Sequence, residues 1–210
     1  LAGHIAFEQA ACLGIPAMTA SHAVDVARAR PGVTILISGG AGSVGHYAIQ
    51  FAKARGATVI TTISSDAKAR LAKEAGADHA IDYRRENVGE RVKALTAGAG
   101  VDAMIELDIS ANAKLIPDVM KPRGHVVIYG NSKPVAEVPS AFCLMNQIVL
   151  QYIFVYELTA EEGRRHAQYR EGVSAGRDRR GARSGGERRD DRQCRRHDVS
   201  GNQISRFSVR

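Results

Sequence analysis

The chain of 210 residues has no tryptophan, and aromatic residues make up only 5% of it. It also has few cysteines, which are far apart and form no Cys-x-x-Cys pair: Cys12, Cys143 and Cys194. This number and spacing exclude a disulfide framework and a cysteine-based metal cluster, and they predict a reducing, cytoplasmic setting. The longest apolar run, residues 148–156, is far shorter than the roughly 20 residues of a membrane-spanning helix, so we expect no membrane partner.

Lysine is absent after residue 163, although arginine is abundant there. Residues 1–163 contain 15 Lys and Arg against 16 Asp and Glu, whereas residues 164–210 contain 14 Arg against 6 acidic residues. The net charge of +7 therefore arises in the tail, and the nearly neutral body argues against a nucleic-acid partner. The tail has neither a helical nor a strand period, which predicts disorder over residues 163–210. A shift of reading frame near Gly163 is one explanation of the tail, and an arginine-rich arm for RNA or DNA is the other.

Short apolar runs alternate with amphipathic stretches between residues 33 and 156. The expected strands are residues 33–38, 57–63, 79–81, 101–107, 125–129 and 148–155. The expected helices between them are residues 43–55, 66–75, 87–96 and 111–120. Strands that are apolar on both faces need helices on both sides, so this alternation predicts an α/β fold with a doubly wound parallel sheet. The Ala-rich residues 8–30 before it predict two short helices, separated by Pro16 and ended by Pro31 and Gly32.

A glycine-rich segment, Gly40-Ala41-Gly42-Ser43-Val44-Gly45, follows the first expected strand directly and opens the first expected helix. In a dinucleotide-binding unit with this spacing, the first glycine permits a tight turn, the second lets the backbone approach a pyrophosphate, and the third allows close helix packing. The phosphates then face the free N–H groups and the positive dipole end of the helix. The segment therefore predicts a Rossmann domain over residues 31–162, with an ordinary turn without a ligand as the alternative. The residues expected at the cofactor are Gly40, Gly42, Ser43, Val44 and Gly45.

Four segments resemble, in their order and spacing, the medium-chain dehydrogenase/reductase superfamily and within it the zinc-independent quinone oxidoreductase branch: residues 10–20, 39–45, 75–78 and 81–83. The resemblance covers about residues 8–159 and implies a GroES-like catalytic domain followed by a Rossmann domain. Only the second is expected here, with residues 1–30 as linking helices, so we expect a fragment that by itself at most binds cofactor. The resemblance further implies hydride transfer from NADPH to a quinone or enone, and a homodimer formed through the edge strand, residues 148–155. No catalytic residue and no metal ligand is assigned.

Several alternatives stay open at this point. A zinc-dependent alcohol dehydrogenase of the same superfamily would have most of its zinc ligands in the preceding domain, and an enoyl reductase module has the same glycine turn. A cofactor-binding or regulatory module without catalysis belongs to a different functional class.

The end of the second expected strand bears on the choice between NAD(H) and NADP(H). An NAD-specific site has an acidic side chain there, whereas this chain has Ile63. Asp66 lies nearby, but it falls in the first turn of the next helix, where its charge suits the helix dipole. Ser64 and Lys68 are suited to a phosphate, and the resemblance implies that Lys68 and Tyr83 line the 2′-phosphate pocket of NADPH. We therefore expect NADP(H) as the cofactor.

Gly130 follows the fifth expected strand, at the carboxyl edge of the sheet where open α/β folds bind ligands. We expect it to let the nicotinamide ribose approach the backbone. The turn after the fourth expected strand, residues 107–110, departs from the small, glycine-containing turn that is frequent in the superfamily. Asp108 in this turn is assigned no catalytic role, because its position also suits a helix N-cap.

Overall fold

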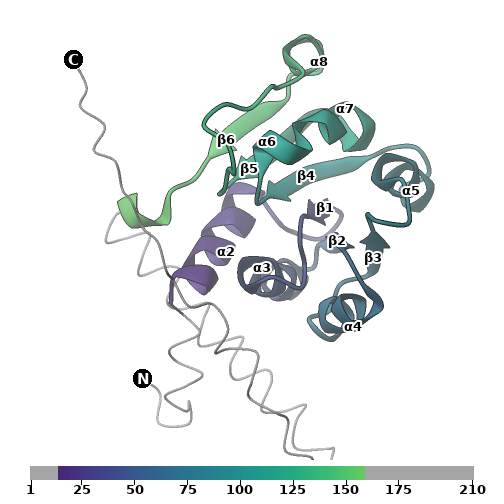
Figure 1. The fold of residues 1–210 in the computed structure, drawn as a ribbon, viewed down its shortest axis with the longest axis vertical. Helices are drawn as coiled ribbons and strands as arrows, with labels where there is room; N and C mark the ends of the chain where they lie inside the picture. The colour runs from purple at the N-terminus through teal and green to yellow at the C-terminus, as the bar shows by residue number, and fades with distance from the viewer. Residues whose placement is uncertain (1–13, 159–210) are drawn as a thin grey trace, which may run out of the picture.

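The computed structural model describes residues 14–158, in which a parallel sheet lies between two layers of helices (Figure 1). The strands are β1 Thr34–Ile37, β2 Thr58–Ile63, β3 His79–Asp82, β4 Val101–Glu106, β5 Met120–Ile128 and β6 Val149–Tyr152. They pair in the order β3-β2-β1-β4-β5-β6, and every pair is parallel. The order reverses between β1 and β4, which confirms the expected doubly wound α/β fold. The first N-terminal helix, the disordered tail and the shift of reading frame are predictions that lie outside the described residues.

The helices are α2 Ile15–Val26, α3 Ser43–Ala54, α4 Asp66–Glu74, α5 Val88–Leu95, α6 Ile109–Asn112, α7 Ile116–Val119 and α8 Ser140–Met145, with 3₁₀ turns η1 Ala113–Leu115 and η2 Val155–Glu157. Two of them begin at side-chain caps. Ser65 Oγ accepts the N–H of Lys68 before α4, and Asn87 Oδ1 accepts the N–H of Glu90 before α5. None of the helices within residues 14–158 is long and apolar enough to cross a membrane.

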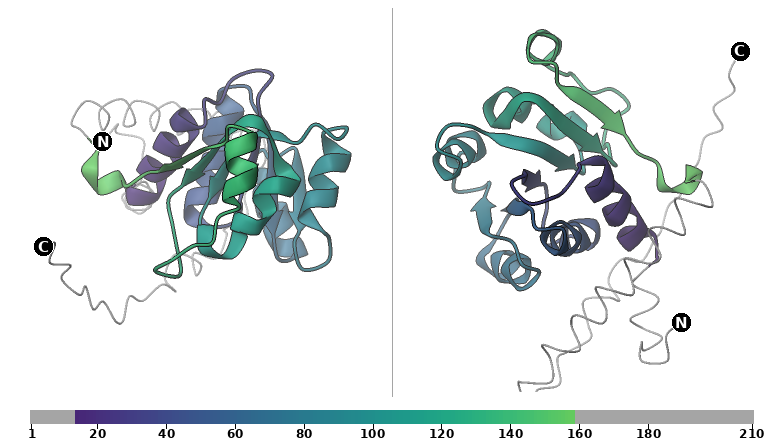
Figure 2. Two further views of the ribbon diagram at one scale, coloured as in Figure 1. Left: turned by 90° about the horizontal axis from the view of Figure 1, so that it is seen from above. Right: turned by 180° about the vertical axis from the view of Figure 1, so that it is seen from behind.

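Side chains of the central strands alternate between two hydrophobic cores, one on each face of the sheet. Ile35 and Ile37 of β1 belong to the core that includes buried residues of α2, α3 and α4. Leu36, between them, belongs to the core that includes buried residues of α5, α6 and α7. Figure 2 shows these two groups of helices on opposite sides of the sheet. Because each central strand is covered on both faces, most of its side chains are apolar and buried.

The segment between β4 and β5 differs from the single helix that was predicted for residues 111–120. It consists of α6, η1 and α7, and Pro117, which has no amide hydrogen, lies in the first turn of α7. Met120 is the first residue of β5, where it pairs with Val101 across a shift in the strand register. The helical prediction was wrong here because the pairing of Met120 depends on a strand that is distant in the sequence.

Two smaller corrections concern other segments, and one expectation is tested only in part. Pro16 lies in the first turn of α2, where a missing amide hydrogen has no cost, and the helix expected before it lies outside the described residues. β6 ends at Tyr152 and is shorter than the strand predicted for residues 148–155, since the chain turns into η2. α8 has no counterpart among the expected helices.

Candidate cofactor-binding site

The glycine turn joins β1 to α3 at the point where the strand order reverses. Gly39 has a φ of +68°, a left-handed backbone conformation that favours glycine. Its carbonyl oxygen accepts the N–H of Gly42 at 2.8 Å, and the N–H of Gly40 donates to the carbonyl oxygen of Thr62 at 3.1 Å. The amides of Gly40 and Gly42 are therefore used to close the turn, and contacts to an anion must come from the amides that follow.

The three glycines of the motif differ in the space around them. Gly40 and Gly45 are buried, and a Cβ atom would overlap Oγ1 of Thr61 at the first position and the carbonyl oxygen of Gly39 at the second. Gly42 is exposed, and a Cβ atom there would lie 3.2 Å from that same carbonyl oxygen. Gly40 and Gly45 are thus required by packing, whereas Gly42 leaves the outer face of the turn open.

The N-terminus of α3 begins on this open side of the turn. The N–H groups of Ser43, Val44 and Gly45 belong to the first helical turn and have no acceptor within the helix. Ser43 is exposed, and the first turn of α3 contains no acidic residue that would compete for these donors. The helix dipole adds partial positive charge at the same place. This arrangement is suited to a diphosphate.

The carboxyl end of β2 has a serine and a lysine in contact. Lys68 Nζ donates to Ser64 Oγ at 3.0 Å, and the serine is buried while the lysine is exposed. Ile63, at the position where an acid would select NAD(H), is buried and apolar. The structure thus brings Ser64 and Lys68 together, as the sequence predicted, and offers no carboxylate at position 63.

Tyr83 lies beside this pair, because its backbone N–H donates to the carbonyl oxygen of Ile63 at 3.1 Å. Its side chain is 53% exposed and open to a ligand. Asp66 forms an ion pair with Arg85, with Oδ1 and Nη1 3.1 Å apart. Arg85, which the sequence analysis missed, therefore offsets the negative charge of Asp66 near Lys68. The signal in the sequence was the pair of arginines directly after Tyr83.

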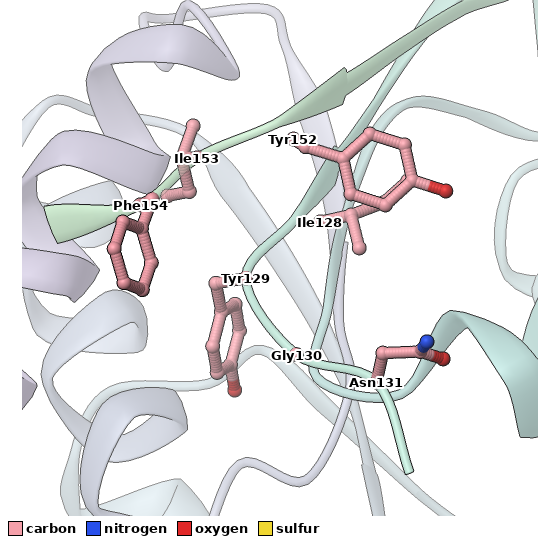
Figure 3. Close-up of a pocket in the computed structure, with 7 residues that line it drawn as sticks. All are labelled: Ile128, Tyr129, Gly130, Asn131, Tyr152, Ile153 and Phe154. Atoms are coloured by element: carbon pink, nitrogen blue, oxygen red, sulfur yellow. The ribbon is translucent and has the colours of Figure 1, made fainter. Parts of the chain in front are cut away.

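An apolar pocket of about 290 Å³ lies at the carboxyl ends of β5 and β6 (Figure 3). Burial raises the pKa of the Tyr129 phenol, and the nearby charge of Glu106 raises it further, so the hydroxyl group stays protonated. A concave apolar site with a few polar atoms suits a flat ring. Only Gly130 of the lining had been predicted from the sequence. The lining residues are Ile128, Tyr129, Gly130, Asn131, Tyr152, Ile153 and Phe154.

Gly130 has a packing reason to be glycine. A Cβ atom at this position would overlap the carbonyl oxygen of Leu107, which follows β4. The N–H of Ile109 also donates to the carbonyl oxygen of Gly130, at 3.4 Å. The close approach of the ends of β4 and β5 therefore accounts for this glycine, and its contact with a ribose stays a prediction.

Asp108 joins the turn after β4 to the loop after β5. It occupies the N-cap position of α6 but makes no capping hydrogen bond there. Its Oδ1 instead accepts the hydroxyl of Ser110 at 2.6 Å and the backbone N–H of Ser132 at 3.0 Å. These hydrogen bonds from Ser110 and Ser132 lower the pKa of Asp108 to about 2. The carboxylate thus connects two loops, which replaces the expected role as a helix cap.

Potential metal ligands are scattered over the described part of the chain. Within residues 14–158, no three His, Cys, Asp or Glu side chains are clustered so that they could hold a metal ion. A zinc site needs three or four such ligands, so these residues do not fit a zinc ion.

Comparison with known proteins gives matches over most of the described residues. Residues 43–171 match the family model of zinc-binding dehydrogenases. A quinone oxidoreductase of Pseudomonas aeruginosa is 40% identical over 136 residues, which cover 64% of this chain and 42% of that protein. A 2-haloacrylate reductase of Burkholderia is 34% identical over 126 residues, which cover 60% of this chain and 38% of that protein. The crystal structure of Escherichia coli quinone oxidoreductase with NADPH is similar, with a TM-score of 0.72 and 30% identity, over 81% of this chain and 53% of that one.

The chain covers less than half of the length of the two relatives. The chain spans 42% of the length of the Pseudomonas protein and 38% of the Burkholderia protein. Both relatives are therefore more than twice as long as the segment that they share with this chain.

Proposed function

Because the chain belongs to the zinc-binding dehydrogenase family, within the medium-chain dehydrogenase/reductase superfamily, we propose that it forms the NADP(H)-binding part of an oxidoreductase. The observation that carries this proposal is the open glycine turn. Gly42 leaves its outer face free, and the unpaired first N–H groups of α3 point to the same side.

The residues at the edge of the sheet would hold the cofactor in four places. The amides of Ser43, Val44 and Gly45 would bind the diphosphate, and the Lys68 ammonium would bind the 2′-phosphate beside Ser64. The Tyr83 ring would lie against the adenosine half, and the pocket after β5 would receive the nicotinamide. The bound cofactor would supply a hydride from its reduced nicotinamide ring, and the chain would orient that ring and exclude water from it.

We infer that the hydride acceptor is a quinone or an enone. Both are flat and conjugated, and the aromatic lining of the pocket, Tyr129 and Phe154, suits the stacking of flat rings. The names of the relatives, quinone oxidoreductase and 2-haloacrylate reductase, also indicate conjugated substrates. Alignment of donor and acceptor would remove much of the entropic cost of the bimolecular step. Contacts to the acceptor would come largely from a domain outside this chain.

The test of the cofactor assignment is fluorescence titration of the chain with NADPH and NADH. Lys68→Ala is expected to weaken NADPH binding by about tenfold to a hundredfold, since a hydrogen bond to a charged group contributes about 1.5–3 kcal/mol. NADH has no 2′-phosphate, so its affinity should change less than about twofold. Lys73→Ala is the matched control, because Lys73 lies in the last turn of the same helix. Equal binding of the two cofactors by the unaltered chain, or equal loss of both in Lys68→Ala, would contradict the assignment.

We further propose that two copies of the chain associate through β6. This strand lies at the edge of the described sheet and exposes Val149 and Tyr152. An exposed apolar edge strand is a template for pairing with a second strand. Light scattering should give twice the 22.5 kDa mass of the chain, whereas the Val149→Lys variant should have the mass of the monomer. If the unaltered chain has the mass of a monomer at micromolar concentration, the proposed association through β6 is wrong.

A further inference from the structure

A buried carboxylate lies where the ends of β1 and β4 meet. Glu106 is the last residue of β4, and none of its surface is exposed. Oε2 accepts the hydroxyl of Ser38 at 2.5 Å. Oε1 accepts the backbone N–H of Asp108 at 2.6 Å and the side-chain amide of Asn112 at 2.8 Å. Three donors from three different segments therefore converge on one side chain.

Such a carboxylate is costly to bury, because it loses its hydration. Within residues 14–158, no lysine, arginine or histidine forms an ion pair with Glu106, so its burial is offset by hydrogen bonds to neutral donors. The preceding residues of β4, Met104 and Ile105, fill the two cores with apolar side chains. For packing alone, an apolar residue at position 106 would have been sufficient.

The partners of Glu106 are the segments that flank the crevice at the reversal of strand order. Ser38 directly precedes Gly39 and the glycine turn, whereas Asp108 and Asn112 belong to the turn after β4 and to α6. The backbone carbonyl of Glu106 also accepts the N–H of Tyr129, at 3.1 Å, and Tyr129 lines the pocket after β5. One residue thus contacts both the turn suited to a diphosphate and the strand end suited to a ring.

We propose that Glu106 is a positioning residue, whose carboxylate fixes the glycine turn relative to the end of β4, while its backbone carbonyl joins that strand end to the pocket after β5. The proposal rests on the nucleotide binding proposed above. A ligand that contacts both places needs this fixed separation, whereas a ligand held only at the end of β2 does not. Glu106 itself would not touch the ligand, because it is fully buried.

Two substitutions separate the geometry of Glu106 from its charge. Glu106→Gln keeps all three links, because the amide oxygen can accept from Asp108 and Asn112 while the amide nitrogen donates to the Ser38 hydroxyl. Glu106→Leu has a similar volume but loses the three side-chain hydrogen bonds and leaves their donors without a partner, whereas the backbone hydrogen bond to Tyr129 stays. Ser38→Ala removes only the link to the glycine turn.

The probes are NADPH, which would span both places, and adenosine 2′-monophosphate, which has the 2′-phosphate but no 5′-phosphate and no nicotinamide. Glu106→Leu should weaken NADPH binding about tenfold or more and change binding of the monophosphate less than about twofold. Glu106→Gln should restore NADPH binding to within about threefold of the unaltered chain. Met104→Ala, a buried neighbour on β4, is the control for loss of stability and should leave both affinities in place.

The outcomes decide between the proposal and its rivals. NADPH binding that survives in Glu106→Leu, or equal loss of both probes, would overturn a positioning role. Loss of NADPH binding in Glu106→Gln would overturn it as well and would assign the effect to charge. If Glu106→Leu does not fold, Ser38→Ala gives the decision. It should weaken NADPH binding about threefold or more and leave the affinity for adenosine 2′-monophosphate unchanged, and an unchanged NADPH affinity would overturn the proposal. Failure of the unaltered chain to bind either probe would instead refute the proposed function.

Discussion

Gly42→Ala is expected to lower the affinity for NADPH about a hundredfold while the chain stays folded. Gly42 has φ −75° and ψ 165°, which any residue adopts, and an added Cβ atom would need only a small shift of the Gly39 carbonyl oxygen, at 3.2 Å. The added methyl group would occupy the outer face of the turn, where a diphosphate must approach the backbone. Loss of two charge-assisted hydrogen bonds, about 1.5 kcal/mol each, corresponds to roughly this factor. Fluorescence titration and a urea unfolding curve measure the two effects.

The binding control for this variant is adenosine 2′-monophosphate. It has the 2′-phosphate but no phosphate that would reach the turn, so its affinity should be the same for Gly42→Ala and for the unaltered chain. Unchanged NADPH affinity in the folded variant would show that the open face of the turn is not where the cofactor binds.

Gly45→Ala is expected to have the opposite profile, with a large effect on stability. Alanine inside a helix ordinarily stabilises it by about 0.5–1 kcal/mol relative to glycine. At Gly45, however, the new Cβ atom would overlap the backbone carbonyl of Gly39, so this group would have to move much further than for Gly42→Ala and would lose its hydrogen bond from the N–H of Gly42. Overpacking of this kind costs about 1–3 kcal/mol, so the variant should be less stable than the unaltered chain. Urea unfolding measures the change in the free energy of unfolding.

Gly89, in the first turns of α5, provides a second test of the same physical effect. A Cβ atom there would lie 2.7 Å from Cβ of Asp118 on α7, an atom that the backbone holds in place. Gly89→Ala should therefore also lower the free energy of unfolding by about 1–3 kcal/mol. A gain of stability in Gly45→Ala would mean that α3 does not pack against the turn as described.

Those parts of the fold that depend on local pattern could be predicted from the sequence. β2 and β4 are largely buried on both faces, and their extents follow from the sequence pattern to within a residue. The two helices that begin after the caps Ser65 and Asn87 were likewise predicted to within a residue. The region around Met120 could not be predicted, because its strand character comes from pairing with Val101.

In the candidate site, too, the short-range features could be predicted from the sequence and the long-range ones could not. The glycine spacing and the contact of Ser64 with Lys68 are short-range features, so the sequence could predict them. The burial of Glu106 could not be inferred, because a glutamate at the end of a strand is ordinarily exposed and its partner Ser38 is distant in the sequence. The pocket was missed for a similar reason, since its aromatic residues come from the ends of two strands that pair only in the fold.

The amide NMR spectrum of the chain during titration with NADPH tests most directly whether the glycine turn holds a diphosphate. The amide signals of Ser43, Val44 and Gly45 should shift most, they should saturate together with the Lys68 region, and the shifts should vanish in Gly42→Ala. If these three signals stay in place while NADPH saturates other parts of the chain, the cofactor does not bind at the turn.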